Sequence, residues 1–148
     1  MNKAFVKEPE QSTAAQCPRC GSLGIAVGEA TLDAQLAPEA RQTIGDSAFF
    51  CPFPTCEAAY FDLFERVVPV AALAHPVYPK DPDAPICPCF GFTREAIEQD
   101  LAEGGVRRTR ELIEKAKSSA ARCLTQAPDG RSCVAEVQRY YMQRRGQA

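Results

Sequence analysis

The chain has 148 residues, of which 45% are hydrophobic and 8% aromatic, with eight Cys and no Trp. This length suits one ordinary domain or two small ones, and two small metal-stapled domains fit the composition better than a single large apolar core. The net charge of −2 gives no indication of binding to nucleic acid or to an anionic membrane surface. The charge is uneven, because residues 1–86 carry six Lys and Arg against eleven Asp and Glu, a net of −5, whereas residues 87–148 carry eleven against eight, a net of +3.

The N-terminal segment, residues 1–16, is polar and has no apolar stretch of signal-peptide length. No window approaches the roughly 18 apolar residues of a membrane span. We therefore expect a cytoplasmic protein without membrane insertion. Thiols stay reduced in the cytoplasm, so the eight cysteines indicate metal ligands before disulfides. Disulfides remain the alternative for a chain exported by a route that this segment does not reveal.

Short strands are expected in the first half of the chain. The best candidates are residues 22–30, 46–50 and 59–70, the last rich in aromatic and β-branched side chains. A short helix is expected around residues 38–43.

A proline-rich stretch divides the chain, with six prolines between residues 69 and 88. Prolines break helices and favour extended chain, so we place a domain boundary near residue 74. The sequence then predicts an α+β fold with a small β-rich domain over residues 1–74 and a helical domain over residues 75–148. The single histidine, His75, lies in this stretch. It could replace one thiolate ligand, but a surface or core role suits its position better.

The second half has helical periodicity. Thr93 is a candidate N-cap for a helix that the Gly104 and Gly105 pair ends. A second helix is expected over residues 109–122, and a third over residues 134–141. A Pro-Asp-Gly turn lies between the last two helices.

The first four cysteines have the spacing of zinc ligands. Cys17-Pro-Arg-Cys20-Gly21 is a zinc-knuckle sequence, since two intervening residues let both sulfurs reach one ion and Gly21 allows a positive φ. The second pair, Cys51 and Cys56, follows about thirty residues later. Two facing pairs form a closed tetrahedral thiolate site, the type that holds structural zinc. A Cu(I) or other soft-metal transfer site and a metal-free redox pair remain alternatives.

The third cysteine pair, in Cys87-Pro-Cys89-Phe-Gly91-Phe-Thr93, has a different spacing. One intervening residue is unusual for a zinc ribbon but suits two sulfurs that bind one iron. Gly91 permits close approach of the backbone to inorganic sulfide. The helix that begins at Thr93 would present N–H groups that stabilise negative charge. These features favour a [2Fe–2S] cluster over a second zinc.

Two further cysteines, Cys123 and Cys133, would supply the other iron of such a cluster. We expect the first at a helix end and the second just before the last helix. The cluster with four thiolates is an anion, so the basic excess of this half is what electrostatics would require.

Taken in order, these motifs resemble those of a known family. A C-x-C pair, two helices and two cysteines around a loop resemble the bacterioferritin-associated ferredoxin (BFD-like) [2Fe–2S] fold. The whole arrangement resembles the N-terminal domain of the archaeal CopZ copper chaperones and their stand-alone bacterial relatives. The matching segments are residues 17–21, 50–61, 87–93 and 128–133. The resemblance spans about residues 15–141.

This resemblance implies zinc in a zinc-ribbon-like domain and a [2Fe–2S] cluster in a BFD-like domain. The implied zinc ligands are Cys17, Cys20, Cys51 and Cys56, and the implied cluster ligands are Cys87, Cys89, Cys123 and Cys133. The ten-residue step between the last two is wider than in BFD proteins but resembles the CopZ arrangement. The copper-binding domain that follows in the archaeal chaperones has no counterpart in this sequence, so the resemblance does not carry copper delivery with it.

The function expected from these features is redox rather than enzymatic. No nucleophile and base combination indicates a catalytic site, whereas an all-thiolate [2Fe–2S] cluster carries single electrons. We expect a reductant in copper or other soft-metal handling, whose partner is a metal transporter, a chaperone or a redox protein. The alternatives are a metallochaperone or cluster-transfer protein that binds Cu(I) or Hg(II) through its thiolates, and an interaction module stapled by both metals. The sequence gives no oligomeric state.

Overall fold

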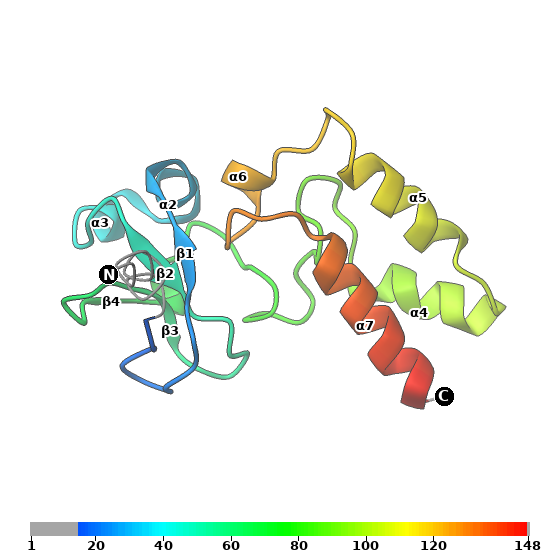
Figure 1. Cartoon of the computed structure of the whole chain (residues 1–148), viewed down its shortest axis with the longest axis horizontal. Coiled ribbons are helices and arrows are strands. Elements are labelled where there is room, and N and C mark those ends of the chain that lie inside the picture. Colours follow the sequence, from blue (N-terminus) through cyan, green and yellow to red (C-terminus); the bar gives the residue numbers. More distant parts are fainter. Residues whose placement is uncertain (1–14, 148) are drawn as a thin grey trace, which may run out of the picture.

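The computed structural model describes residues 15–147, so the expectation for the N-terminal segment falls almost entirely outside the described residues. The chain forms a sheet half (residues 15–72), a connecting segment (73–93) and a helical half (94–147), with the two halves side by side (Figure 1). The sheet half contains β1 (Ile25–Val27), α2 (Glu29–Gln35), α3 (Pro38–Arg41), β2 (Ala48–Phe50), β3 (Ala58–Phe61), β4 (Val67–Pro69) and the 3-10 helix η2 (Val70–Ala72). The helical half contains α4 (Arg94–Glu103), α5 (Arg107–Ala116), α6 (Cys123–Gln126) and α7 (Val134–Gln147). The fold is therefore α+β, as the sequence predicts.

The four strands form one antiparallel sheet in the order β1-β2-β3-β4. Side chains alternate between the two faces of such a sheet. Phe50 and Tyr60 point to one face and pack with α2 around Leu32. Phe49 and Phe61 point to the other face, with stacked rings 5.5 Å apart, and pack with the first cysteines. The sheet thus separates an apolar core from the first cysteine cluster.

The helical half has a separate core. Ile97 of α4, Leu112 of α5 and Val137 of α7 are buried together, and Cys87 and Cys133 belong to the same cluster. The second cysteine set is therefore built into the packing of these helices. None of the helices among residues 15–147 is long and apolar enough to cross a membrane.

Several predicted elements are confirmed. β2 ends at Phe50, directly before Cys51, and α3 covers most of the expected 38–43 helix. Thr93 occupies the N-cap position of α4, and Gly104 ends this helix in the left-handed conformation at φ +79°.

Three element predictions are wrong in extent. The expected strand over residues 22–30 ends at Val27, and α2 begins at Glu29. The expected strand over residues 59–70 is a hairpin, because the Asp62 carboxylate accepts hydrogen bonds from two backbone N–H groups in the turn that joins β3 to β4. The expected helix over residues 109–122 ends at Ala116.

Candidate metal centres

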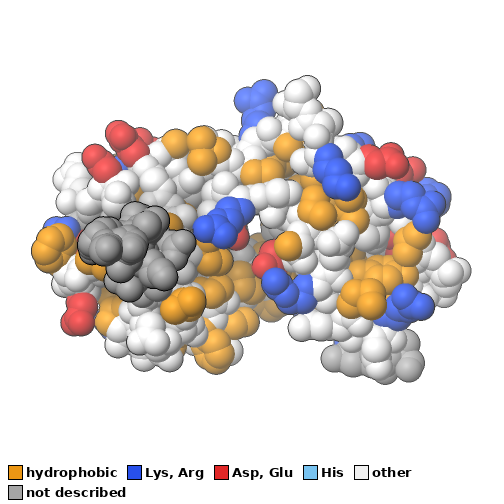
Figure 2. All heavy atoms as spheres, viewed as in Figure 1, with side chains coloured by type: hydrophobic (Ala, Val, Ile, Leu, Met, Phe, Trp, Pro, Cys, Tyr) orange, Lys and Arg blue, Asp and Glu red, His pale blue; other side chains and the backbone are white. Residues whose placement is uncertain are grey.

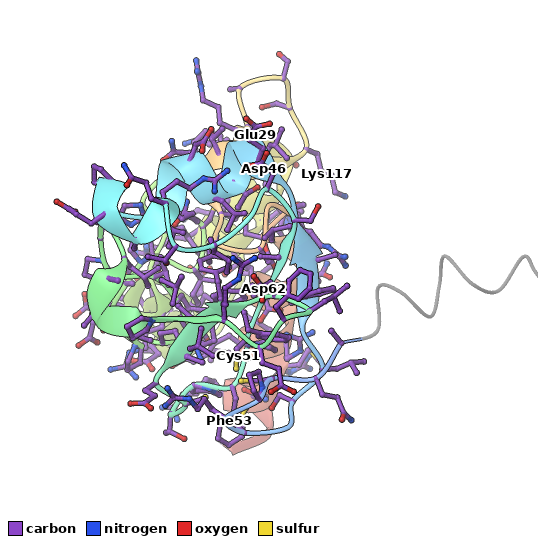
Figure 3. All side chains as sticks on the ribbon, turned by 90° about the vertical axis from the view of Figure 1, so that its left-hand side faces the viewer. Glu29, Asp46, Cys51, Phe53, Asp62 and Lys117 are labelled. Carbon is purple, nitrogen blue, oxygen red and sulfur yellow. The ribbon has the colours of Figure 1, made fainter. Side chains whose placement is uncertain are left out.

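The first centre is built by two turns, one carrying Cys17 and Cys20 and the other Cys51 and Cys56. Both turns lie on the side of the sheet to which Phe49 and Phe61 point. The sulfur atoms of Cys17, Cys20, Cys51 and Cys56 all lie within 4.8 Å of one another. The Sγ atoms are 3.9 Å apart between Cys17 and Cys56 and 3.5 Å apart between Cys20 and Cys51. Tetrahedral zinc with Zn–S bonds of about 2.3 Å places its sulfurs about 3.8 Å apart. The four thiols therefore fit a zinc ion. Figure 3 shows this group of sulfur atoms beside Cys51.

Local backbone geometry aims these sulfurs inward. The N–H groups of Arg19 and Ala58 donate to the sulfurs of Cys17 and Cys56, each at 3.4 Å. Gly21 closes the first turn at φ +80°, a conformation that glycine adopts without a steric penalty. Such N–H donors favour the ionised thiolate that a metal requires.

The thiols of the first centre differ in acidity. Burial tends to raise the pKa of Cys20, but hydrogen bonding with Ser22 outweighs it and lowers the pKa to about 6. Burial raises the pKa of Cys51 to about 12. The pKa of Cys56 is also raised, with burial as the main cause. Because thiols packed so closely resist joint ionisation, a bound cation is the natural way to hold four thiolates here.

Lys80 of the connecting segment supports this centre, a role that its sequence position does not reveal. Its Nζ donates to the carbonyls of Phe53 and Cys56, at 2.7 and 3.1 Å. Its charge also lowers the pKa of Cys51, against the larger effect of burial. His75, by contrast, is exposed, and its Nδ1 lies 3.2 Å from the carbonyl of Pro76, so no contact places it at this centre.

The second cysteine set consists of four thiols that influence one another electrostatically. The thiol of Cys87 interacts electrostatically with those of Cys133 and Cys89, and the thiol of Cys123 interacts with that of Cys89. Cys87 and Cys133 are buried, whereas Cys89 and Cys123 are half-buried. Among residues 15–147, the four sulfurs that all lie within 4.8 Å of one another are those of the first set. The sulfurs of the second set are therefore less tightly grouped than those of the first.

Backbone hydrogen bonds and turns fix the positions of the cysteines in the second set. Cys87 and Phe92 exchange backbone hydrogen bonds of 3.0 and 3.1 Å, and Gly91 takes φ +64° in the turn between them. The N–H of Arg122 donates to Cys89 Sγ at 3.3 Å. Cys133 directly precedes α7, and its backbone carbonyl accepts a hydrogen bond from the N–H of Val137 at 2.9 Å. Cys123 opens the short helix α6.

The thiols of this second set are also unequal. Hydrogen bonding with Cys133 lowers the pKa of Cys87 to about 6. The same contact raises the pKa of Cys133, and burial raises that of Cys123. The set therefore carries one readily ionised thiol, Cys87, and a bound cationic group would favour ionisation of Cys123 and Cys133.

Comparison with known proteins agrees with the first centre. Residues 14–74 match the CopZ zinc-binding family, which is described as a zinc binding domain. No protein of curated function matches the chain in sequence. The chain is similar to the X-ray structure of the Archaeoglobus fulgidus CopZ N-terminal domain, with a TM-score of 0.71 and 24% identity over 84% of this chain and 96% of that one. Residues 14–74 therefore match a CopZ-like zinc-binding domain with four cysteines grouped for a metal, and the chain has the fold of a CopZ N-terminal domain.

Proposed function

We propose that the chain is a zinc-stabilised [2Fe–2S] protein that supplies single electrons in the handling of copper or another soft metal. Zinc would be held by Cys17, Cys20, Cys51 and Cys56, and the cluster by Cys87, Cys89, Cys123 and Cys133. The chemistry that such a cluster supplies is one-electron transfer.

The observation that carries this proposal is the looser grouping of the second four cysteines, whose thiols interact in a row from Cys133 through Cys87 and Cys89 to Cys123. A [2Fe–2S] cluster takes two thiolates at each of two irons, so it needs a wider set of sulfurs than one zinc ion. Cys87 and Cys133 are buried in the helical core, which suits a resident group, and Cys89 and Cys123 leave one edge open to a partner.

The charges around this set suit an anionic group. The N–H of Arg122 already donates to Cys89 Sγ, and Cys133 lies at the N-terminal end of α7, where the helix dipole stabilises negative charge. Lys and Arg side chains are spread over the helical half on the face shown in Figure 2. Residues 115–128 contain three basic residues and no acidic one. An electron acceptor, in the form of a metal transporter, a chaperone or a redox protein of the cytoplasm, would dock at the half-buried Cys89 and Cys123.

The test is the metal content of the full chain purified without oxygen. We expect one zinc, two irons and two sulfides per chain, with an EPR signal after dithionite that disappears on reoxidation. Cys89→Ser should abolish iron, sulfide and visible absorption but retain zinc. Cys56→Ser is the matched variant and should lose zinc. Two zinc ions without sulfide in the wild-type chain would contradict the proposal.

A second candidate function is transfer of Cu(I) or Hg(II) through the thiolates of the first centre. Cys20 is exposed while Cys17 and Cys51 are buried, so one sulfur is open to attack by an acceptor thiol. Incubation of the loaded chain with a thiol-rich acceptor distinguishes the two functions. If the metal passes rapidly to the acceptor and the Cys20→Ser variant passes it more slowly, metal trafficking is favoured. If the chain keeps its zinc and its iron is reduced reversibly, electron transfer is favoured.

A further inference from the structure

The loop between the last two cysteines, residues 123–133, is held by the other half of the molecule. It consists of α6 and the turn that leads to α7. Figure 1 shows α6 between α2 of the sheet half and the helices of the helical half. A helix of four residues has almost no stability of its own, and its last carbonyls need external donors. The partners of these carbonyls therefore decide where the loop lies.

Two side chains of α2 supply these donors. Thr31 Oγ1 donates to the carbonyl of Leu124 at 2.5 Å. Gln35 Nε2 donates to the carbonyls of Thr125 and Gln126, at 2.7 and 3.1 Å. Thr31 and Gln35 are four residues apart and so share one face of α2. The end of α6 is thus capped from a distant part of the chain.

The next turn is held in the same way. The hydroxyl of Tyr60 in β3 donates to the carbonyl of Pro128. Gly130 takes φ +68° and packs so closely on α2 that an added Cβ would lie 2.7 Å from Thr31 Oγ1. Both halves of the loop therefore rest on the sheet half.

These contacts are buried, which makes them specific. Thr31, Gln35 and Tyr60 are each at most 1% exposed. Burying polar atoms is unfavourable unless they are hydrogen-bonded, and apolar side chains would suit a core whose only task is packing. Gln35 Nε2 makes its two hydrogen bonds to this loop, whereas Gln35 Oε1 has no hydrogen-bond partner among residues 15–147.

From this arrangement we infer that Thr31, Gln35 and Tyr60 are positioning residues for Cys123 and Cys133. They belong to the sheet half and touch no cysteine of the second set in any contact described above. They act by fixing the loop whose two ends carry these thiols. The inference rests on the proposed function, because its consequence is that the zinc-binding half sets the geometry and retention of the [2Fe–2S] cluster.

The experiment compares a double variant that carries both Thr31→Val and Tyr60→Phe with the control variant Thr43→Val. All proteins are the full chain loaded with zinc and the [2Fe–2S] cluster. Thr43 Oγ1 makes a similar hydrogen bond within the sheet half, to the carbonyl of Ala40 at 2.7 Å, but it is exposed and does not contact the loop. The readouts are zinc, iron and sulfide content, the EPR line shape, the reduction potential and the rate of iron loss to a chelator.

We expect the double variant to keep one zinc and its cluster, to lose iron roughly fivefold or more faster, and to show altered EPR and potential. Thr43→Val should match the wild type, and Tyr60→Phe with Thr31→Ser should recover part of the difference. Unchanged iron loss, EPR line shape and reduction potential in the double variant would overturn the positioning role of Thr31 and Tyr60 and leave the proposed function standing. A wild-type chain without iron and sulfide would overturn the proposed function and the positioning role together.

Discussion

Lys80 shows how a single residue of the connecting segment completes the first centre. It donates to the carbonyls of Phe53 and Cys56, the latter a cysteine of the centre, and lies 6.0 Å from the centre of the Phe50 ring. Its ammonium group therefore fixes the second turn and brings positive charge toward a group of thiolates. Such supporting groups influence metal affinity without touching the metal.

Lys80→Met is expected to weaken zinc binding by about tenfold or more, because both the turn and the compensating charge are lost. Competition with a chromophoric zinc chelator measures the change. Lys115→Met removes an exposed lysine of the helical half and is the matched control. Equal zinc affinity in the two variants would show that Lys80 has no role at the centre.

Asp100 is the second residue whose environment has a measurable consequence. Its carboxylate is buried and accepts hydrogen bonds from the N–H and hydroxyl of Thr109 at 2.7 and 2.8 Å, and from Arg108. Burial tends to raise the pKa of Asp100, but these hydrogen bonds outweigh it and lower the pKa below its usual range. The ionised carboxylate thus joins the end of α4 to the start of α5.

Asp100→Asn is expected to lower the free energy of unfolding at pH 7 by about 1–3 kcal/mol, since donors are left facing an amide. A lowered pKa stabilises the folded chain fully above the unfolded value of about 3.9 and ceases to do so as pH falls through the folded pKa. The difference in the free energy of unfolding between the wild type and Asp100→Asn should therefore become smaller in acid. Urea unfolding at pH 7 and pH 3 tests this, with Glu111→Gln as an exposed control on α5. A gap of equal size at both pH values would contradict the assignment.

At the scale of elements, Gly24, the residue before β1, lies close against side chains of β2 and β3. A Cβ added at Gly24 would lie 2.5 Å from Cζ of Phe61 and 2.7 Å from Cβ of Phe49. These two rings form the stacked pair above the first centre. The absence of a side chain at Gly24 is therefore what allows the segment after the first turn to lie against the sheet.

Gly24→Ala is expected to destabilise the zinc-loaded chain by about 1–3 kcal/mol, because the rings must shift. Gly28→Ala is the matched control, since nothing lies within 4 Å of the added methyl group there. Thermal unfolding measures both variants. Equal midpoints would show that the packing at Gly24 relaxes at no cost.

At the scale of the whole molecule, two cores meet through the loop that α2 and Tyr60 hold. One face of the sheet packs the apolar core and the other packs on the cysteines of the first centre, whereas the core of α4, α5 and α7 has its own apolar residues. Small domains of this kind take much of their folding free energy from the metal. The two halves should therefore respond differently to zinc removal.

Zinc removal by a chelator is expected to expose the amides of β2 and β3 to hydrogen exchange while α4 and α7 stay protected. The amides of residues 124–126 should lose protection at the same time as those of the sheet half, because side chains of α2 hold the carbonyls of these residues. Exchange followed by mass spectrometry or NMR measures each segment. Simultaneous loss of protection in α4 and α7 would show instead that the chain unfolds as one unit.

The elements that sequence reasoning located are those with local signals. Thr93 and Gly104 mark the ends of α4, and the cysteine spacing marks the first centre. Sequence reasoning does not find the turn at Asp62, because apolar residues continue on both sides of it. An aspartate whose carboxylate accepts from the backbone N–H two residues later, here that of Phe64, is nevertheless a local turn signal. The start of α2 was missed because residues 22–30 carry no clear helical period, and this helix is defined by its packing on the sheet.

The sequence by itself determined the α+β class and a four-cysteine group suited to zinc. These features depend on spacing and periodicity within short stretches of chain, which local geometry dictates. Only the tertiary structure decided that Lys80 supports the first centre and that Thr31, Gln35 and Tyr60 hold the loop carrying Cys123 and Cys133. Such contacts join residues up to 93 positions apart, and no pattern along the chain specifies them because they exist only once both halves have packed together.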